Sequence, residues 1–168
     1  MTGQETATVD PKLVTAFVKS TKNVLSTMAR IEAHMGKPGL KVVPTPAYDV
    51  SGIVGFTGEV MGSVVVSFRQ DTALSIVKAF SGEEMDVKSD DFADAIGEIC
   101  NIIAGNAKKE FGLVAGIGIP SVIIGPGHTV ARLRDVPCVL IPCTSDAGDF
   151  AVEVNIKQVA CVTSGGKA

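Results

Sequence analysis

One long segment near the middle of the chain, residues 89–111, carries its apolar side chains at the spacing of an α-helix. At about 100° per residue they fall on a single stripe, formed by Phe92, Ile96, Ile99, Ile103 and Ala107. The segment starts with Ser89-Asp90-Asp91, all good capping residues. Because an apolar stripe must be buried against another element, the segment predicts a long helix packed on a sheet.

The opposite face of this helix lacks the long Lys–Glu pairs of an ordinary solvated surface. Asp94, Glu98, Asn101 and Gly105 gather there, and Glu98 and Asn101 are neighbours because they lie three residues apart. Gly105 costs roughly 1 kcal/mol of helix stability relative to alanine, which suggests that another surface approaches it. The spacing alone also fits a solvated face, so it predicts an exposed polar site without naming its chemistry.

Helices and strands are also expected on both sides of this segment. A first helix begins at Asp10-Pro11 and is expected to run to about His34. Two strands follow at 51–59 and 62–70, and then a helix over 71–82 with Asp71 as its cap. Further strands are expected at 120–127, 128–134, 137–145 and 149–159. We expect one domain over residues 10–163, between a flexible leader (1–9) and a loose tail (164–168).

A weak internal repeat predicts that the domain consists of two related halves. Asn23 in STKNVLSTM aligns with Asn101 in EICNIIAGN, and the segment from Ile53 aligns without gaps on the segment from Val139. Ser20 then takes the place of Glu98, so one half keeps a polar pair that the other has lost. A chance likeness between two helix-and-hairpin units would give the same pattern.

Charge and hydropathy exclude several classes of function. The net charge is −3 and no basic run is longer than Lys108-Lys109, so a nucleic-acid partner is not expected. No apolar run approaches the 18 or more residues of a membrane span, and the polar start MTGQETATVD lacks a signal-peptide core. We expect a cytoplasmic protein that binds neither membrane nor nucleic acid.

Cysteine and histidine offer no metal or redox motif. None of the four cysteines forms a CxxC pair, and each lies in or beside an apolar stretch: Cys100, Cys138, Cys143 and Cys161. Buried free thiols are the expected state. His34 and His128 are isolated, so no metal site is predicted.

The string FADAIGEICNIIAGNAKKEF resembles the signature helix of the CheC/CheX/FliY phosphatases of bacterial chemotaxis. The hairpin GIVGFTGEVMGSVVVSF and the first helix with NVLSTM extend the likeness over most of the chain. Members of the CheC type usually carry two E-x-x-N motifs, whereas members of the CheX type carry one, as here. The resemblance implies a CheC-like α+β domain of two pseudo-repeated halves, with long helices on a largely antiparallel sheet. It also implies a homodimer.

The resemblance further implies a reaction and roles for the polar pair. The substrate would be the aspartyl phosphate of phosphorylated CheY or a similar response regulator. Asn101 would position the attacking water and Glu98 would pair with the regulator's lysine. Mg²⁺ would come from the regulator, and the chain would need no cofactor of its own. Asp94 and Gly105 would be further partner contacts.

Three other functions compete with this one. An interaction module like the FliM middle domain would bind without hydrolysis, and this alternative stays open. An enzyme built on the GPGHT turn at 125–129 is disfavoured, because the turn lacks the G-x-x-x-x-G-K-[ST] pattern of a phosphate loop. A cysteine-dependent phosphatase is disfavoured because no cysteine lies in a CxxxxxR arrangement.

Overall fold

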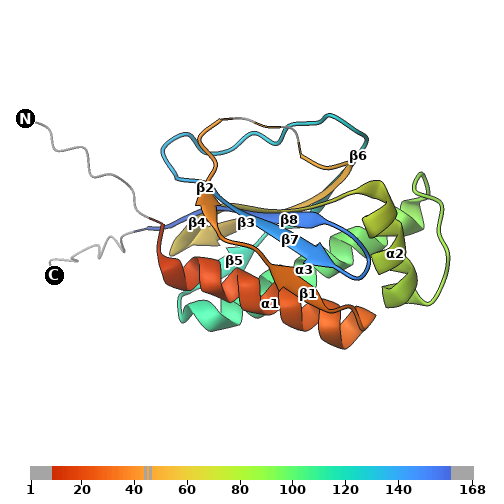
Figure 1. The fold of residues 1–168 in the computed structure, drawn as a ribbon. Helices are drawn as coiled ribbons and strands as arrows, with labels where there is room; N and C mark the ends of the chain where they lie inside the picture. The colour runs from red at the N-terminus through yellow and green to blue at the C-terminus, as the bar shows by residue number, and fades with distance from the viewer. Residues whose placement is uncertain (1–8, 44, 46, 160–168) are drawn as a thin grey trace, which may run out of the picture.

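The computed structural model describes residues 9–43, 45 and 47–159 and folds them as helices on one antiparallel sheet (Figure 1). The helices are α1 (Pro11–Ala29), α2 (Gln70–Ser81) and α3 (Asp90–Phe111). The strands are β1 (Ala33–Met35), β2 (Gly39–Leu40), β3 (Val50–Gly58), β4 (Val60–Phe68), β5 (Ala115–Ile117), β6 (Ser121–Ile124), β7 (Val139–Ser145) and β8 (Phe150–Gln158). The predicted α+β class is confirmed.

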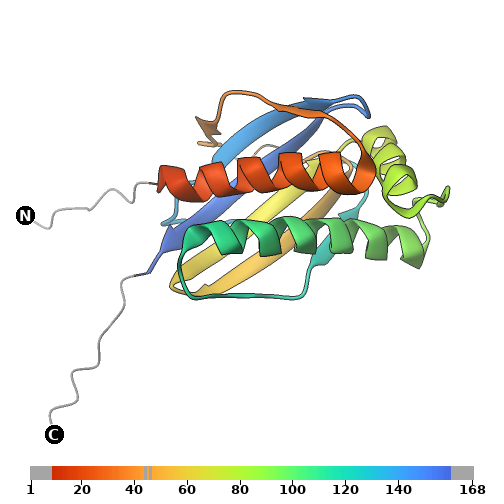
Figure 2. The same ribbon diagram turned by 90° about the horizontal axis from the view of Figure 1, so that it is seen from below.

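Helices cover only one face of the sheet. Helices α1 and α3 lie side by side across that face and run in opposite directions, while α2 lies at one end (Figure 2). Irregular segments that follow β2 and β6 cover the other face (Figure 1). They are joined by backbone hydrogen bonds from Lys41 N to Cys138 O (2.8 Å) and from Ala47 N to His128 O (2.9 Å).

The order of strands shows how the two halves interlock. The sheet runs β1-β7-β8-β4-β3-β5, with β2 also paired to β7 and β6 also paired to β3. Each half therefore gives its two short strands to the long hairpin of the other half. The two hairpins meet at the centre, where β4 and β8 pair over their whole length, from Val60 opposite Gln158 to Phe68 opposite Phe150. The predicted arrangement of two pseudo-repeated halves is confirmed.

The gapless alignment of the two hairpins is wrong in its first strand. Val54 and Phe56 of β3 are buried on the helix-covered face. Their gapless partners, Leu140 and Pro142, are more exposed, because β7 buries the intervening Ile141 in the core. Since successive side chains of a strand point to opposite faces, the alignment of β3 with β7 must be shifted by an odd number of residues.

The core confirms the stripe predicted on α3. Its five apolar side chains are at most 1% exposed: Phe92, Ile96, Ile99, Ile103 and Ala107. The helix approaches the sheet closely at Gly52, where an added Cβ would lie 2.3 Å from the Sγ atom of Cys100. The edge of the core holds three phenylalanine rings, with centroids 5.6–5.9 Å apart: Phe17, Phe56 and Phe111.

Helix α1 begins where predicted and ends earlier. Asp10 caps it by accepting a hydrogen bond from Lys12 N at 2.9 Å, and Pro11 takes the first helical position. The helix ends at Ala29 because Arg30 adopts a left-handed conformation (φ 54°). The predicted extension to His34 is wrong, since that residue lies in β1.

Two further local predictions are wrong. Asp71 does not cap α2: the N-cap is Arg69, and the carboxylate that accepts from Gln70 N is that of Asp49, 2.9 Å away. Residues 128–134 form no strand and belong to the irregular cover of the second face. Leu133 N donates there to Asn155 Oδ1 of β8 (2.9 Å), so contacts with the sheet hold this segment in place of strand pairing.

The cysteines that the structure describes are buried free thiols, as predicted. Burial raises the pKa of Cys100 to about 12, and burial does the same for Cys143. Cys161 and the predicted tail lie outside the described residues, as does the leader except Val9, which packs against the core. Within residues 9–43, 45 and 47–159, no helix is long and apolar enough to cross a membrane.

Candidate active site on helix α3

Helix α3 is a long, well-capped platform for the polar pair. Ser89 Oγ accepts from Phe92 N at 3.2 Å, and Gly112 ends the helix in the left-handed conformation. Acidic residues occupy its first turn and Lys108-Lys109 its last, as the helix dipole favours. One face packs on the sheet and one side packs against α1. The polar pair therefore projects from a backbone that is fixed over its full length.

Glu98 and Asn101 line one hollow of about 510 Å³. Glu98 is exposed and Asn101 is half-buried. Asp94 lines the same hollow, so the structure brings three of the four predicted site residues together. The rest of the lining was not predicted from the sequence: Ala93, Gly97, Ile119, Pro120 and Val122. The hollow thus lies between α3 and the chain that connects β5 to β6.

No neighbouring group occupies the polar atoms of this pair. In the part of the chain that the structure describes, neither Glu98 nor Asn101 makes a side-chain hydrogen bond or an ion pair. An exposed carboxylate such as that of Glu98 needs no partner, but a polar side chain taken out of water is usually hydrogen-bonded, so the unengaged amide of the half-buried Asn101 is the more informative of the two. Both side chains are free to bind a molecule that enters the hollow.

The two glycines of the helix differ in their surroundings. A Cβ added to Gly97 would lie 3.6 Å from Val122 Cγ2 and 3.8 Å from Pro120 Cβ, which is ordinary van der Waals contact, so β6 and its approach lie close to the helix beside Glu98 and an alanine would fit there as well. Gly105 lies on the same face as Glu98 but outside the lining of the hollow, and an added Cβ there would meet nothing within 4 Å. The surface at Gly105 is open, as the prediction of a partner contact requires. The sequence around Gly97 carries no signal that places β6 beside the helix.

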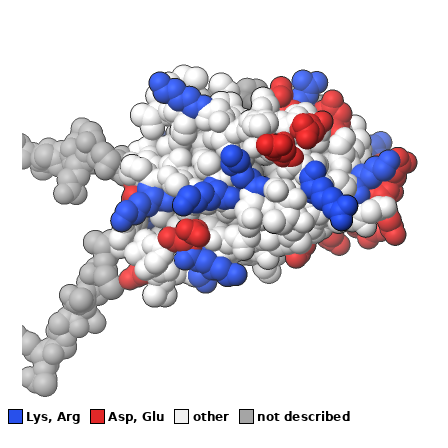
Figure 3. All heavy atoms as spheres, turned by 60° about the horizontal axis from the view of Figure 1, so that its bottom comes forward, with Lys and Arg blue, Asp and Glu red and all other residues white. Residues whose placement is uncertain are grey.

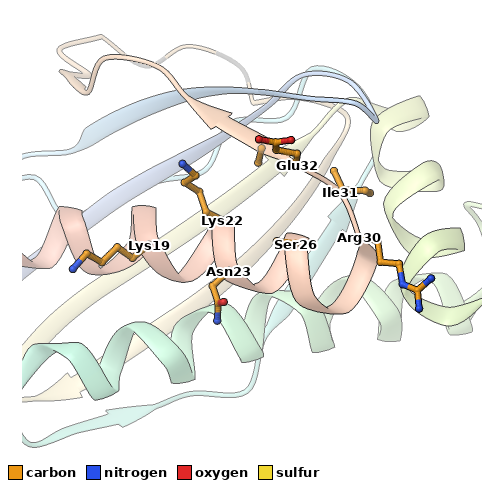
Figure 4. Close-up of a pocket in the computed structure, with 8 residues that line it drawn as sticks. Lys19, Lys22, Asn23, Ser26, Arg30, Ile31 and Glu32 are labelled. Atoms are coloured by element: carbon orange, nitrogen blue, oxygen red, sulfur yellow. The ribbon is translucent and has the colours of Figure 1, made fainter.

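The half that contains α1 has a larger hollow without such a pair. It measures about 700 Å³ and includes Asn23, the residue aligned with Asn101 (Figure 4). Ser20, aligned with Glu98, is buried and donates a hydrogen bond to Ile103 O at 2.6 Å. The side chains of Lys19, Asn23 and Arg30 point away from one another (Figure 4). The hollow on α1 is therefore not a second copy of the site.

Charge is divided over the surface that α1 presents. Basic side chains form a row across the middle of this face, over α1, and acidic side chains gather at the end occupied by α2 and its connection to α3 (Figure 3). The exposed residues behind this division are Lys12, Lys19 and Lys22 on α1, Arg30 just after it, and Glu83, Glu84 and Asp86 between α2 and α3. The start of α3 adds Asp90 and Asp91, so the site lies on the acidic side of the helix pair.

The other catalytic groups considered from the sequence have structural surroundings. Cys100 is 1% exposed and faces Gly52 of the sheet, away from the hollow. The ring of His128 is held by Gly125 O (2.6 Å) and Ser51 Oγ (2.7 Å) on the opposite face of the sheet. Among the described residues, no cluster of histidine, cysteine and carboxylate side chains is suited to hold a metal ion.

Comparison with known families gives this site its context. The family model described as chemotaxis phosphatase CheX matches residues 50–144, a stretch that contains both long strands of the first hairpin and all of α3. The chain belongs to the CheX family. The prediction of a chemotaxis phosphatase of this family, and hence of a hydrolase, is confirmed.

Individual CheX proteins are similar over almost their whole length. The CheY-P phosphatase CheX of Thermotoga maritima is 30% identical over 154 residues, which cover 89% of this chain and 99% of that protein. A chemotaxis protein CheX from Desulfovibrio desulfuricans is 38% identical, with a TM-score of 0.79 and coverage of 88% and 99%. The CheX in a CheX–CheY–BeF3–Mg²⁺ complex from Borrelia burgdorferi is 29% identical, with a TM-score of 0.74 and coverage of 87% and 98%. The roles of Glu98 and Asn101 stay predictions.

Proposed function

We propose that this CheX-family chain hydrolyses the aspartyl phosphate of phosphorylated CheY or of a similar receiver domain. The observation that carries the proposal is the unengaged Glu98–Asn101 pair, which lines a hollow on a rigid helix. Two relatives support the choice of substrate: one is described as a CheY-P phosphatase, and the other was solved in complex with CheY.

The reaction needs a water molecule in line with the bond that breaks. The water oxygen attacks phosphorus, the bond from phosphorus to the aspartate oxygen breaks, and phosphate leaves a free carboxylate behind. Such phosphoryl transfers depend mainly on positioning and on electrostatic stabilisation. The carboxamide of Asn101 suits the task because it can accept a hydrogen bond from the water and donate another. No nucleophile from this chain is required.

Glu98 would fix the docking register one turn away. Side chains at this spacing have Cβ atoms about 5–6 Å apart, so one partner can contact both. The carboxylate would pair with the lysine of the receiver's active site, and the receiver would supply the Mg²⁺. Asp94, on the same side of the hollow, and the open surface at Gly105 would accommodate the rest of the receiver.

The test is a time course of receiver dephosphorylation with Mg²⁺ and purified variants. Asn101→Ala is expected to lower kcat by about 100-fold or more, the usual cost of removing one group aligned with the transition state. Glu98→Gln keeps the size of the side chain and removes its charge, so it is expected to raise KM. Neither side chain has a hydrogen-bond or ion-pair partner among the described residues, so the thermal unfolding temperature should stay within a few degrees of wild type.

Asn23→Ala is the matched control, because Asn23 is the aligned asparagine on α1 and is exposed. Its activity should equal that of the wild type. If Asn101→Ala and Glu98→Gln both keep the wild-type rate, the assigned roles are wrong. Binding of the phosphorylated receiver by the wild type without any acceleration would favour the interaction module instead.

We further propose that the chain forms a homodimer through the edge of the sheet that carries β1 and β2. Three exposed aliphatic side chains lie at the end of β2 and just after it, Leu40 (65% exposed), Val42 (78%) and Val43 (59%), and Leu40 lines an apolar hollow of about 360 Å³. The opposite edge, where β6 pairs with β3, is less suitable, because Val122 of β6 already lines the α3 hollow. A cytoplasmic location remains a prediction as well.

Light scattering after gel filtration tests the dimer. Wild type is expected at twice the chain mass, and Val42→Asp should shift it to the monomer, because an unpaired carboxylate resists burial at an interface. Val114→Asp is the control that should stay dimeric. Val114 is equally exposed, at 77%, but lies next to β5 at the opposite edge of the sheet. A wild type that runs as a monomer at high concentration would contradict the proposal.

A further inference from the structure

Ile119 is the most exposed large apolar side chain of the described residues, at 94%. It lies in the connection from β5 to β6 and lines the same hollow as Glu98 and Asn101. Single apolar residues are ordinary on protein surfaces. The position of Ile119 is unusual, because it stands at the rim of the hollow that also contains the family's polar pair.

The backbone that presents Ile119 is fixed on both sides. Strands β5 and β6 both pair with β3, and between them Gly118 N donates to Gly55 O at 2.9 Å. Pro120 restricts its own backbone and that of the preceding Ile119. The chain after α3 runs back along the outer side of that helix, away from α1 (Figure 2). Ile119 therefore cannot turn inward to the core without breaking the pairing with β3.

The connection is also tied to the helix that carries the pair. Helix α3 lies close to the segment Pro120–Val122 at Gly97, on the turn that bears Glu98, where an added Cβ would be in ordinary van der Waals contact with both residues. The distance from the apolar rim to the polar pair is thus set by backbone packing and does not depend on a flexible loop. A rigid apolar anchor beside a few polar groups is the usual composition of a strong protein–protein contact.

We propose that Ile119 is a docking residue for the receiver domain and selects receivers that offer an apolar depression beside the phosphorylated aspartate. This inference rests on the proposed function and deepens it, because it assigns substrate selection to a residue outside the E-x-x-N motif. Glu98 binds the cationic group of the receiver, and Ile119 binds the apolar depression on the other side of the reacting phosphate. Burial of a whole isoleucine side chain is worth about 10- to 100-fold in affinity.

Steady-state kinetics with phosphorylated CheY as the probe separates docking from chemistry. Ile119→Ser is expected to raise KM by about 10-fold or more while kcat stays near wild type. Ile119→Val loses one methylene group and should change KM by no more than about 4-fold. Val114→Ser is the control: Val114 is also highly exposed and lies before β5, outside the lining of the hollow, so its KM should not change.

Calorimetric titration of BeF3-activated CheY into each variant gives the matching equilibrium measurement. The Kd for Ile119→Ser should rise by the same factor as KM, and thermal unfolding should be unaffected because the side chain makes almost no contact in the free protein. An active wild type with unchanged KM and Kd in Ile119→Ser overturns the docking role alone. A fall in kcat at constant KM overturns it too. A wild type that does not accelerate dephosphorylation of any receiver overturns the proposed function. The Kd of the wild type for CheY then shows whether docking is retained without catalysis.

Discussion

The polar atoms of Glu98 and Asn101 face water in the free protein, so a partner must replace that hydration when it binds. A receiver that brings a lysine and an ordered water does so, because each polar atom exchanges one hydrogen bond for another. A partner with only apolar surface would leave the carboxylate unpaired, at a cost of several kcal/mol. If the pair binds a receiver as proposed, it therefore also disfavours apolar ligands.

Residue burial also predicts the chemical behaviour of two cysteines. For Cys100, a pKa raised from 9.0 to about 12 lowers the thiolate fraction at pH 8 by about 1,000-fold, and burial further limits access. Iodoacetamide should label Cys100 and Cys143 in the folded protein at least about 100-fold more slowly than in urea. Mass spectrometry of the corresponding peptides measures both rates, and rapid labelling of either native thiol would contradict the structure.

The same shifts predict a loss of stability in alkali. These pKa values are raised on folding, so the folded chain keeps protons that the unfolded chain releases above pH 9. The stabilisation is complete below pH 9 and decreases as the pH rises from 9 toward 12. Urea midpoints between pH 8 and 11 should fall for wild type and fall less for Cys100→Ala. Equal pH slopes for the two proteins would contradict a contribution from this thiol.

At the scale of the element, α3 combines a buried stripe with a face kept clear for a partner. Gly105→Ala tests helix stability and partner binding separately, since the added methyl group meets nothing within 4 Å in the free protein. The unfolding free energy should rise by up to about 1 kcal/mol, from helix propensity alone. KM for the phosphorylated receiver should rise if the partner approaches this turn as predicted, with kcat unchanged. Denaturant melts and steady-state kinetics check the two effects separately; a stabilised variant with wild-type KM would remove Gly105 from the contact surface.

The elements that could be predicted from the sequence are those whose signal is local. The stripe and caps of α3 fall within one continuous segment, so its bounds and the exposure of Glu98 follow from periodicity. Strands β1, β2 and β5 have two or three residues each and exist because the other half provides a pairing edge. The connection from β5 to β6, which carries Ile119 and forms one wall of the hollow, was not predicted for the same reason. This connection lies beside α3 because β5 and β6 pair with β3, a strand that is distant in the sequence.

At the scale of the whole molecule, the two halves share an architecture and differ in chemistry. Their helices, short strands and long hairpins are interlocked around the β4–β8 pair, which fixes α1 against α3. The repeat could be found in the sequence, but its register could not. The alignment that matches Gly62 with Gly148 pairs side chains of β3 and β7 that point to opposite faces of the sheet. Register depends on the pairing of strands across the sheet, which local similarity does not contain.

The interlocked halves also explain why a second active site cannot be restored on α1 by one substitution. Ser20 occupies the place of Glu98 in the repeat, yet it is 4% exposed and its hydroxyl donates to Ile103 O of α3. Ser20→Glu would place an unpaired carboxylate between the two helices and should lower the free energy of unfolding by about 3 kcal/mol or more. Ser20→Ala loses one hydrogen bond and should cost about 1 kcal/mol.

Ser26→Glu is the matched control on the same helix, since Ser26 is exposed and lines the hollow on α1 beside Lys22. Its stability should stay within about 0.5 kcal/mol of wild type. Urea unfolding of the three variants measures the order, and receiver dephosphorylation with Asn101→Ala as background detects any new site on α1. Recovery of activity by Ser20→Glu in that background, with wild-type stability, would show that α1 presents Ser20 outward. The buried hydrogen bond to Ile103 instead predicts that the half built on α1 contributes packing to the site on α3 and no catalytic group.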